Sequence, residues 1–158
     1  MALGRGCFSI PAGLVPFPNR PDLWWLDNSV SYRRLDGIVV TAPQGFITDD
    51  ASIPKFLDWI PALDRQGRSR LPGIIHDSLY SLGRSRGKAF ADDTLREMCI
   101  QSGINRFWSG VIYQGVNLAG ASAWLADRRV AAEINQQGSF VTITAYQKFK
   151  LAGGSVFS

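Results

Sequence analysis

The stretch LPGIIHDSLYSLGRSRGKAFADDTLREM, residues 71–98, decides the fold because it predicts two short helices joined by a tight basic loop. Pro72 suits the first position of the first helix, where its missing amide hydrogen has no partner to lose and its φ angle is preset. Gly83 is expected to end that helix, and a second helix is predicted to open near Ala89. The apolar residues of the first helix recur at helical spacing as a buried stripe: Leu71, Ile75, Leu79 and Leu82. The two helices should form an antiparallel hairpin at the centre of the fold.

His76, the only histidine of the chain, lies on the first helix, and Tyr80 follows one turn later on the same face. Asp92 and Asp93 fall in the first turn expected for the second helix, where a carboxylate suits the positive end of the helix dipole. The hairpin therefore brings Asp92 or Asp93 within reach of His76. Histidine titrates near neutrality, and a carboxylate bonded to its far nitrogen fixes the tautomer and stabilises the cation formed during proton transfer.

These residues allow two interpretations. In a catalytic site, His76 is the general base, and Asp92 and Tyr80 support it. Asp77, about 100° further around the helix, then holds a divalent cation or a substrate group. In a structural network, a buried histidine bonded to the aspartate and the tyrosine only clamps the two helices together. Composition alone favours the clamp, because a single His-Asp dipeptide is a weak signal.

The rest of the chain predicts a small antiparallel sheet. Ser29 to Arg33 and Ile38 to Thr41 look like two strands joined through the turn Leu35-Asp36-Gly37. Residues 139–149 alternate apolar and polar side chains, which predicts a strand with one wet face that returns to this sheet. The expected fold class is α+β, with the sheet packed on three to four helices that include the central hairpin.

One domain is expected over residues 1–158, because this length suits a single core. Cys7 to Phe17 is proline-punctuated and is expected to be an edge segment, whereas Pro21 to Trp25 is expected to be a break. The expected divisions of the chain are residues 1–44, mainly β; 45–137, mainly helical; the strand 139–149; and a tail over 151–158.

Residues 45–54, GFITDDASIP, gather four short oxygen-bearing side chains: Thr48, Asp49, Asp50 and Ser52. The simplest interpretation is a helix cap at Asp50 or Ser52, ahead of a short apolar helix predicted from Lys55 to Ile60. The alternative is a metal-ligand loop, since Asp49 and Asp50 carry the oxygen ligands that Ca²⁺ prefers.

The chain is moderately basic, with a net charge of +4 and a pI near 9.4, which favours phosphate-bearing partners such as nucleic acid or anionic lipid. Six basic residues bracket the histidine in sequence: Arg65, Arg68, Arg70, Arg84, Arg86 and Lys88. They predict either a positive rim that attracts phosphate groups or an ordinary solvated loop. Because no aromatic side chain is interleaved among them for base stacking, nucleic acid is not the expected partner.

Cys7 and Cys99 are too few for a disulfide framework and are interpreted as free thiols in a reducing compartment. Residues 1–18 lack an unbroken apolar core, so no secretory signal is expected and the expected location is the cytoplasm. The uncharged residues 107–126 could just span a bilayer, but their polar side chains and glycines favour a central helix of a soluble protein.

Three blocks of this sequence resemble the signature of a domain family of unknown function found in bacteriophages and prophages: GFITDDASIP at 45–54, HDSLY at 76–80 and AD at 91–92. The resemblance covers about Gly45 to Gly120, and the three blocks in this order make it specific. It implies a phage or prophage origin, with the host cytoplasm and the virion as locations and other virion proteins as partners.

A second, weaker resemblance supplies chemistry. His76-Asp77-x-x-Tyr80, followed on the next helix by Asp92, is similar to the HDxxY…D pattern of secreted phospholipases A2. This resemblance implies that His76 activates water and that Asp77 binds Ca²⁺, while Asp92 and Tyr80 orient the histidine. The glycine-rich calcium loop of those enzymes is absent here, so Asp49 or Asp50 would have to replace it.

Two functions are therefore expected as alternatives. The first is a phage-encoded His-Asp hydrolase that acts on an ester such as a phospholipid, with Ca²⁺ as the only indicated cofactor and anionic lipid as a partner. The second is a non-enzymatic virion protein of the tail, baseplate or head, in which the same residues clamp the helices and the surface contacts other virion or host proteins. The access of solvent to His76 separates the two.

Overall fold

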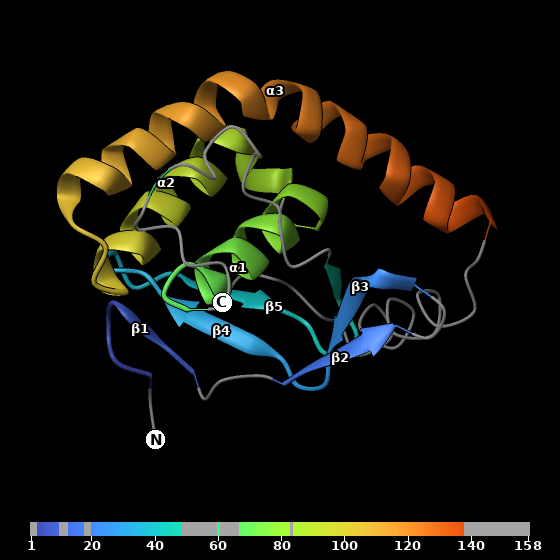
Figure 1. Ribbon diagram of the computed structural model, residues 1–158, viewed down its shortest axis with the longest axis horizontal. Coiled ribbons are helices and arrows are strands. Elements are labelled where there is room, and N and C mark those ends of the chain that lie inside the picture. The colour runs from blue at the N-terminus through green and yellow to red at the C-terminus, as the bar shows by residue number, and fades with distance from the viewer. Residues whose placement is uncertain are drawn as a thin grey trace.

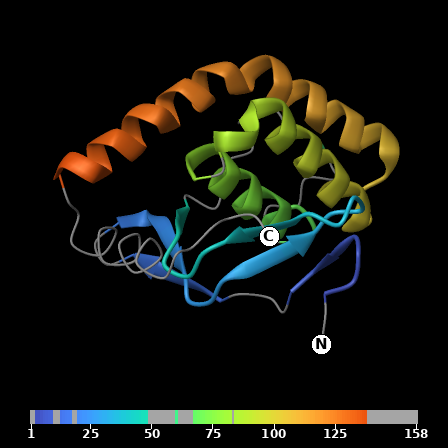
Figure 2. The same ribbon diagram turned by 180° about the vertical axis from the view of Figure 1, so that it is seen from behind.

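The computed structural model describes residues 3–9, 13–17, 20–48, 60, 67–82 and 84–137. These residues form the predicted α+β fold, in which two small antiparallel sheets lie on one side and α-helices on the other. Figure 1 shows the sheets below, α1 (Arg70–Ser81) and α2 (Gly87–Gln101) in the middle, and α3 (Arg106–Gln137) above them. The view from behind in Figure 2 agrees that α3 covers the side of α1 and α2 that faces away from the sheets.

The first sheet has the strand order β1-β4-β5, from β1 (Cys7–Phe8), β4 (Val30–Arg33) and β5 (Val39–Ala42). The predicted hairpin is confirmed, because β4 and β5 pair from Val30 with Ala42 to Arg33 with Val39. Gly37 closes the turn with a φ of +95°, a conformation that glycine adopts without steric strain because it has no Cβ atom. Alternate side chains are buried along both strands and contact α1: Val30, Tyr32, Val40 and Ala42.

The second sheet has the order β2-β3-β6, from β2 (Leu14–Phe17), β3 (Arg20–Leu26) and β6 (Ile47–Thr48). The break predicted from Pro21 to Trp25 is wrong, because these residues belong to the central strand β3. The pairing of β2 with β3 is irregular, because Pro16 pairs with Trp24 and the next residue, Phe17, pairs with Arg20. Pro21 therefore lies in the part of β3 that has no registered partner on β2. A proline is tolerated there because no ladder hydrogen bond needs its missing amide hydrogen. The predicted edge segment is confirmed, since β1 and β2 are both edge strands.

The helical hairpin is confirmed, but both helices begin earlier than predicted. α1 begins at Arg70, so Pro72 is its third residue, still within the first turn where backbone amides have no helical acceptor. The 3-10 helix η2 (Arg84–Arg86) leads directly into α2, which begins at Gly87. Asp92 therefore lies in the second turn of α2, and the interaction with the helix dipole predicted for it is wrong.

Two clusters of buried apolar side chains form the core. The larger one joins the hairpin of the first sheet to α1 and α2: Leu26, Val30, Tyr32, Val40, Ala42, Ile74, Ile75, Leu79, Tyr80, Ala91 and Met98. The smaller one packs α2 against the first half of α3: Ile60, Leu95, Cys99, Ile104, Ile112 and Val116. The predicted stripe of α1 is buried at Ile75 and Leu79, whereas Leu71 and Leu82 at its ends are half-buried.

Some expectations lie outside the described residues. They are the strand at 139–149, the tail at 151–158, the helix at Lys55 to Trp59, and the positions of Asp49 and Asp50.

In the described ranges, no helix is both long and apolar enough to cross a membrane. Cys7 is exposed and Cys99 is buried, and both are free thiols as predicted. Burial raises the pKa of Cys99 to about 12.

Candidate functional site

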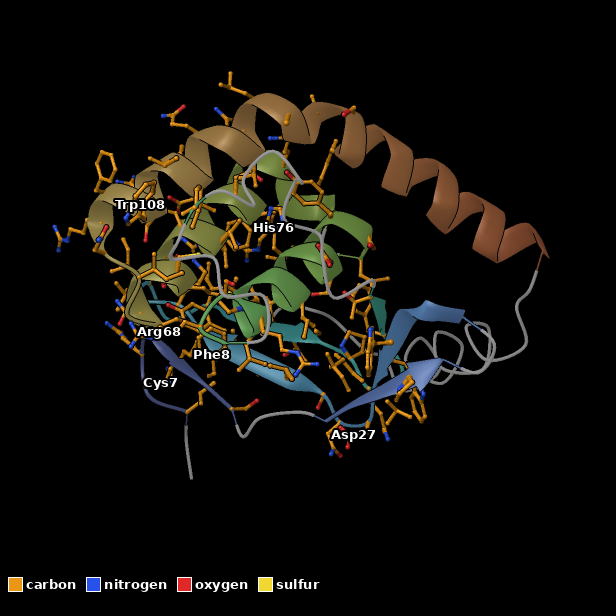
Figure 3. All side chains as sticks on the ribbon, viewed as in Figure 1. Cys7, Phe8, Asp27, Arg68, His76 and Trp108 are labelled. Atoms are coloured by element: carbon orange, nitrogen blue, oxygen red, sulfur yellow. The ribbon has the colours of Figure 1, made fainter. Side chains whose placement is uncertain are left out.

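His76 and Asp92 meet across the helical hairpin. Nε2 of His76, on α1, lies 3.0 Å from Oδ1 of Asp92, on α2. Both side chains are nearly inaccessible, with 4 % of His76 and 0 % of Asp92 exposed. Figure 3 shows His76 within the helical layer beneath α3. Nδ1 of His76 has no hydrogen-bond partner among the residues that the structure describes.

Asp92 is the centre of the site because three side chains donate to its carboxylate. Tyr80 donates its hydroxyl to Oδ1 over 2.6 Å, and Lys88 donates its ammonium to Oδ2 over 2.5 Å. Burial alone would raise the pKa of Asp92, but the hydrogen bonds from His76, Lys88 and Tyr80 outweigh it and lower that pKa. Asp92 is therefore an ionised carboxylate in a dry environment, held by groups on both of its oxygens.

Lys88 is the residue of this site that the sequence reasoning missed, because it was grouped with the basic loop before α2. It lies one turn before Asp92 on α2, and this i, i+4 spacing between opposite charges is the signal that could have found it. Its ammonium also bonds the carbonyl oxygens of Val116, at 3.1 Å, and Asn117, at 3.2 Å. Lys88 therefore ties the site to α3, which no sequence pattern indicated.

Tyr80 supports the site through its ring as well as its hydroxyl. Its ring lies 4.2 Å from the His76 ring, centroid to centroid, and meets the Trp124 ring edge-on at 5.0 Å. Trp124 belongs to α3, so α3 closes over both Tyr80 and Lys88. The tyrosine of the HDSLY block thus contacts the histidine and the aspartate, which is the placement expected from its spacing.

Gly120 lets α3 approach this closely. A Cβ atom at position 120 would lie 2.6 Å from the Tyr80 hydroxyl oxygen and 3.1 Å from Cε of Lys88, and both groups are fixed by Asp92.

We predict that Gly120→Ala lowers the free energy of unfolding by about 1–3 kcal/mol through overpacking, although alanine favours a helix by about 1 kcal/mol over glycine. Gly110→Ala is the matched control, because Gly110 lies on the same helix and a Cβ atom added there would meet nothing within 4 Å. Equal stabilisation of both variants in urea denaturation would contradict the prediction.

Asp77 points away from the His76–Asp92 pair, as its position on the helix predicted. Its Oδ2 accepts a hydrogen bond from the Thr48 hydroxyl over 3.1 Å, so the GFITDDASIP block reaches α1 at this carboxylate. In the described part of the chain, no three His, Cys, Asp or Glu side chains lie close enough to hold a metal ion. Asp77 and Thr48 alone supply fewer oxygens than the six to eight that Ca²⁺ takes.

Asp93, the other candidate partner of His76, faces the first sheet instead. Its Oδ2 lies 3.1 Å from Nη2 of Arg34, which is the residue that follows β4. Arg34 is only 7 % exposed and also pairs with Asp36 at 3.0 Å. Glu97 accepts a hydrogen bond from the Tyr32 hydroxyl over 2.7 Å. Polar side chains of α2 therefore bind the hairpin of the first sheet through Arg34 and Tyr32.

The predicted positive rim is dispersed among separate contacts. Lys88 is neutralised by Asp92, and Arg68 donates to the carbonyl of Gly103 over 3.3 Å. The Arg86 guanidinium lies 5.2 Å from the centroid of the Phe90 ring. Of these three residues, only Lys88 reaches the His76 site, where Asp92 compensates its charge. The described basic residues therefore do not form a shared positive surface around His76.

The fold and the site define a small α+β protein whose helical hairpin holds a buried His-Asp-Tyr-Lys network under a third helix. The chain belongs to the family described as "Protein of unknown function (DUF1353)", whose profile matches residues 24–116, more than half of the chain. The expected membership of a family of unknown function is confirmed, and the match extends further toward the N-terminus than the three blocks did. No curated protein and no solved structure matches the chain.

Proposed function

We propose that this protein is a phage-encoded hydrolase in which His76 acts as general base on an ester substrate. One observation carries the proposal: Asp92 holds Nε2 of His76, while Nδ1 makes no hydrogen bond to any described residue. In the neutral ring, the proton then lies on Nε2 and the free electron pair on Nδ1. This is the arrangement that a carboxylate-oriented histidine base needs.

The proposed reaction is the hydrolysis of an ester to an acid and an alcohol. Nδ1 of His76 takes a proton from water while the water oxygen attacks the ester carbonyl carbon. The ionised Asp92 stabilises the imidazolium that forms, because its pKa is lowered and its charge is close to the ring. The tetrahedral intermediate then collapses, and the leaving alkoxide takes the proton from Nδ1 of His76.

A phospholipid is the proposed substrate, because the sequence pattern HDxxY…D at His76, Asp77, Tyr80 and Asp92 is similar to that of secreted phospholipases A2. An anionic lipid surface is the proposed partner. Ca²⁺ at Asp77, with Asp49 or Asp50, stays a prediction. The two oxygens that Asp77 and Thr48 contribute do not make a Ca²⁺ site by themselves, so no step of the reaction is assigned to a metal.

The experiment compares His76→Gln with the natural protein in a fluorogenic phospholipid assay, with added Ca²⁺ and with a chelator. The glutamine amide can donate to Asp92 as Nε2 does, but it offers no base, so the variant should fold normally. We expect hydrolysis to fall by about 10²–10⁴-fold, the usual contribution of a general base. A folded His76→Gln protein that hydrolyses as fast as the natural one would overturn the proposal.

A second candidate function is a virion or host-interaction protein in which the network is a clamp. The burial of His76 and Asp92 favours it, because an ester must reach a ring that is 4 % exposed. Under this alternative, His76→Ala loses stability, while the natural protein shows no hydrolysis of any ester. Retention of the protein on purified virions would then support a virion location, and its presence in separated heads or tails would distinguish the head from the tail and baseplate.

A further inference from the structure

All three donors of the Lys88 ammonium are used, in a partly buried place. Its three donors match three acceptors: Oδ2 of Asp92 and the carbonyl oxygens of Val116 and Asn117. The side chain is only 18 % exposed, so water competes little for these bonds. A lysine that served only as solvated charge would not be arranged in this way, because burial of an ammonium is unfavourable unless every donor is satisfied.

Gly120 makes the two carbonyl groups reachable. A helical side chain leans toward the N-terminus and covers the turn before its own Cα, so a side chain at 120 would cover the carbonyls at 116 and 117. The Cβ position of Gly120 lies 3.1 Å from Cε and 3.3 Å from Nζ of Lys88, which places the lysine in the space that the glycine leaves open. The contact therefore depends on both helices: α2 supplies the Lys88 side chain, and α3 supplies the two carbonyl acceptors and the space at Gly120.

We infer that Lys88 is a positioning residue of the site: it fixes Asp92 in the orientation that presents Oδ1 to His76, and it fastens this orientation to α3. Oδ1 receives both Nε2 of His76 and the Tyr80 hydroxyl, while Oδ2 bonds only Lys88 among the described residues. Without Lys88, the carboxylate is free to turn about its last side-chain bond, and the histidine loses a fixed partner. This inference rests on the proposed function for its effect on rate, but its effect on the His76–Asp92 bond is independent of catalysis.

The test compares Lys88→Met with Arg96→Met. Arg96 is an exposed residue of α2 whose guanidinium lies 5.7 Å from the Tyr113 ring centroid, so its loss removes the same charge from the same helix without touching Asp92. We expect Lys88→Met to lower kcat of phospholipid hydrolysis by about 10–100-fold with KM unchanged, as small misplacements of reacting groups do. At one fixed pH, the Nε2–H proton of His76 should exchange with water faster than in the natural protein. Arg96→Met should change neither quantity.

The two measurements separate the failure of this inference from that of the proposed function. If Lys88→Met matches Arg96→Met in both kcat and proton exchange, Lys88 is no positioning residue, although His76 can still be the base. If the natural protein hydrolyses no ester, the proposed function fails, and the exchange rate of the His76 proton alone decides the role of Lys88. Should Lys88→Met not fold, Lys88→Gln replaces it. Its shorter side chain has two amide donors for the three acceptors, so it can bond Asp92 but loses the contact with α3. Faster exchange of the His76 proton than in Arg96→Met then supports the inference, and equal exchange overturns it.

Discussion

Asp92→Asn is expected to lower the free energy of unfolding by about 3–5 kcal/mol, the usual cost of breaking a buried ion pair from one side. Asp92 is fully buried, and its ionised carboxylate is the charge that compensates the ammonium of Lys88. The asparagine removes the compensating charge and replaces one of the two acceptor oxygens by an NH2 donor. That NH2 group then faces either the ammonium of Lys88 or the donors of His76 and Tyr80. Urea denaturation followed by circular dichroism measures the difference.

Asp93→Asn is the matched control for this prediction. Asp93 is the next residue of α2, its side chain is 57 % exposed, and it pairs with Arg34 at the surface. Its replacement should cost no more than about 1 kcal/mol. Equal losses for the two variants would show that the Asp92 network does not stabilise the hairpin.

The Asp92→Asn variant also measures how much the ionisation of Asp92 contributes to the stability of the protein at low pH. The pKa of Asp92 is lowered in the folded protein, so its contribution is present above the unfolded value of about 3.9 and is lost as the pH falls through the folded value. The natural protein should therefore lose stability relative to Asp92→Asn when the pH is lowered through that range. If the difference in free energy of unfolding between the natural protein and Asp92→Asn stays constant across that pH range, Asp92 is not ionised in the folded protein.

Arg34→Met is expected to have the second largest effect, a loss of about 2–4 kcal/mol in the free energy of unfolding. The guanidinium bonds Thr94, Asp93 and Asp36, lies 4.5 Å from the Phe90 ring centroid, and is 7 % exposed. Its removal breaks the polar contacts between the hairpin of the first sheet and α2. Thr94, Asp93 and Asp36 then lose the donor that they share. The methionine side chain fills much of the volume, so the loss reports the polar contacts.

Arg33→Met is the control for Arg34→Met. Arg33 precedes Arg34, and its side chain donates to the carbonyl of Leu3 over 3.0 Å. Among the described residues, this hydrogen bond joins the Arg33 side chain only to the N-terminal segment. A loss of about 1 kcal/mol is expected for one part-buried hydrogen bond. If thermal denaturation gives Arg33→Met the larger loss, the Arg34 cluster is not what holds the sheet to the helices.

The parts of the fold with regular periodicity were predictable from the sequence. The hairpin of β4 and β5 followed from alternation around Leu35-Asp36-Gly37, and the helical hairpin followed from the spacing of Ile75 and Leu79. The strand β3 was not predicted, because Pro21 was interpreted as a break. The irregular pairing of β3 with β2 at Pro21 shows why a proline fits there. The start of α2 was misplaced because η2 continues directly into it at Gly87.

The candidate site was predictable where its residues share a helix face and unpredictable where helices from different parts of the chain meet. Spacing alone placed Tyr80 beside His76 and an aspartate of the second helix opposite them. The choice of Asp92 over Asp93 depends on the rotation of α2 against α1, which the sequence does not encode locally. Lys88 was missed because its acceptors on α3 are backbone carbonyls, and Gly120 was missed because only a close helix contact gives it a role.

The most direct test of the central claim is the nitrogen-15 NMR spectrum of the imidazole ring, since His76 is the only histidine and its signals need no assignment. We predict that the neutral ring carries its proton on Nε2, that this proton exchanges slowly with water because Asp92 binds it, and that Nδ1 is unprotonated. A neutral ring with its proton on Nδ1, or an Nε2 proton that exchanges as fast as in a free imidazole, would contradict the account.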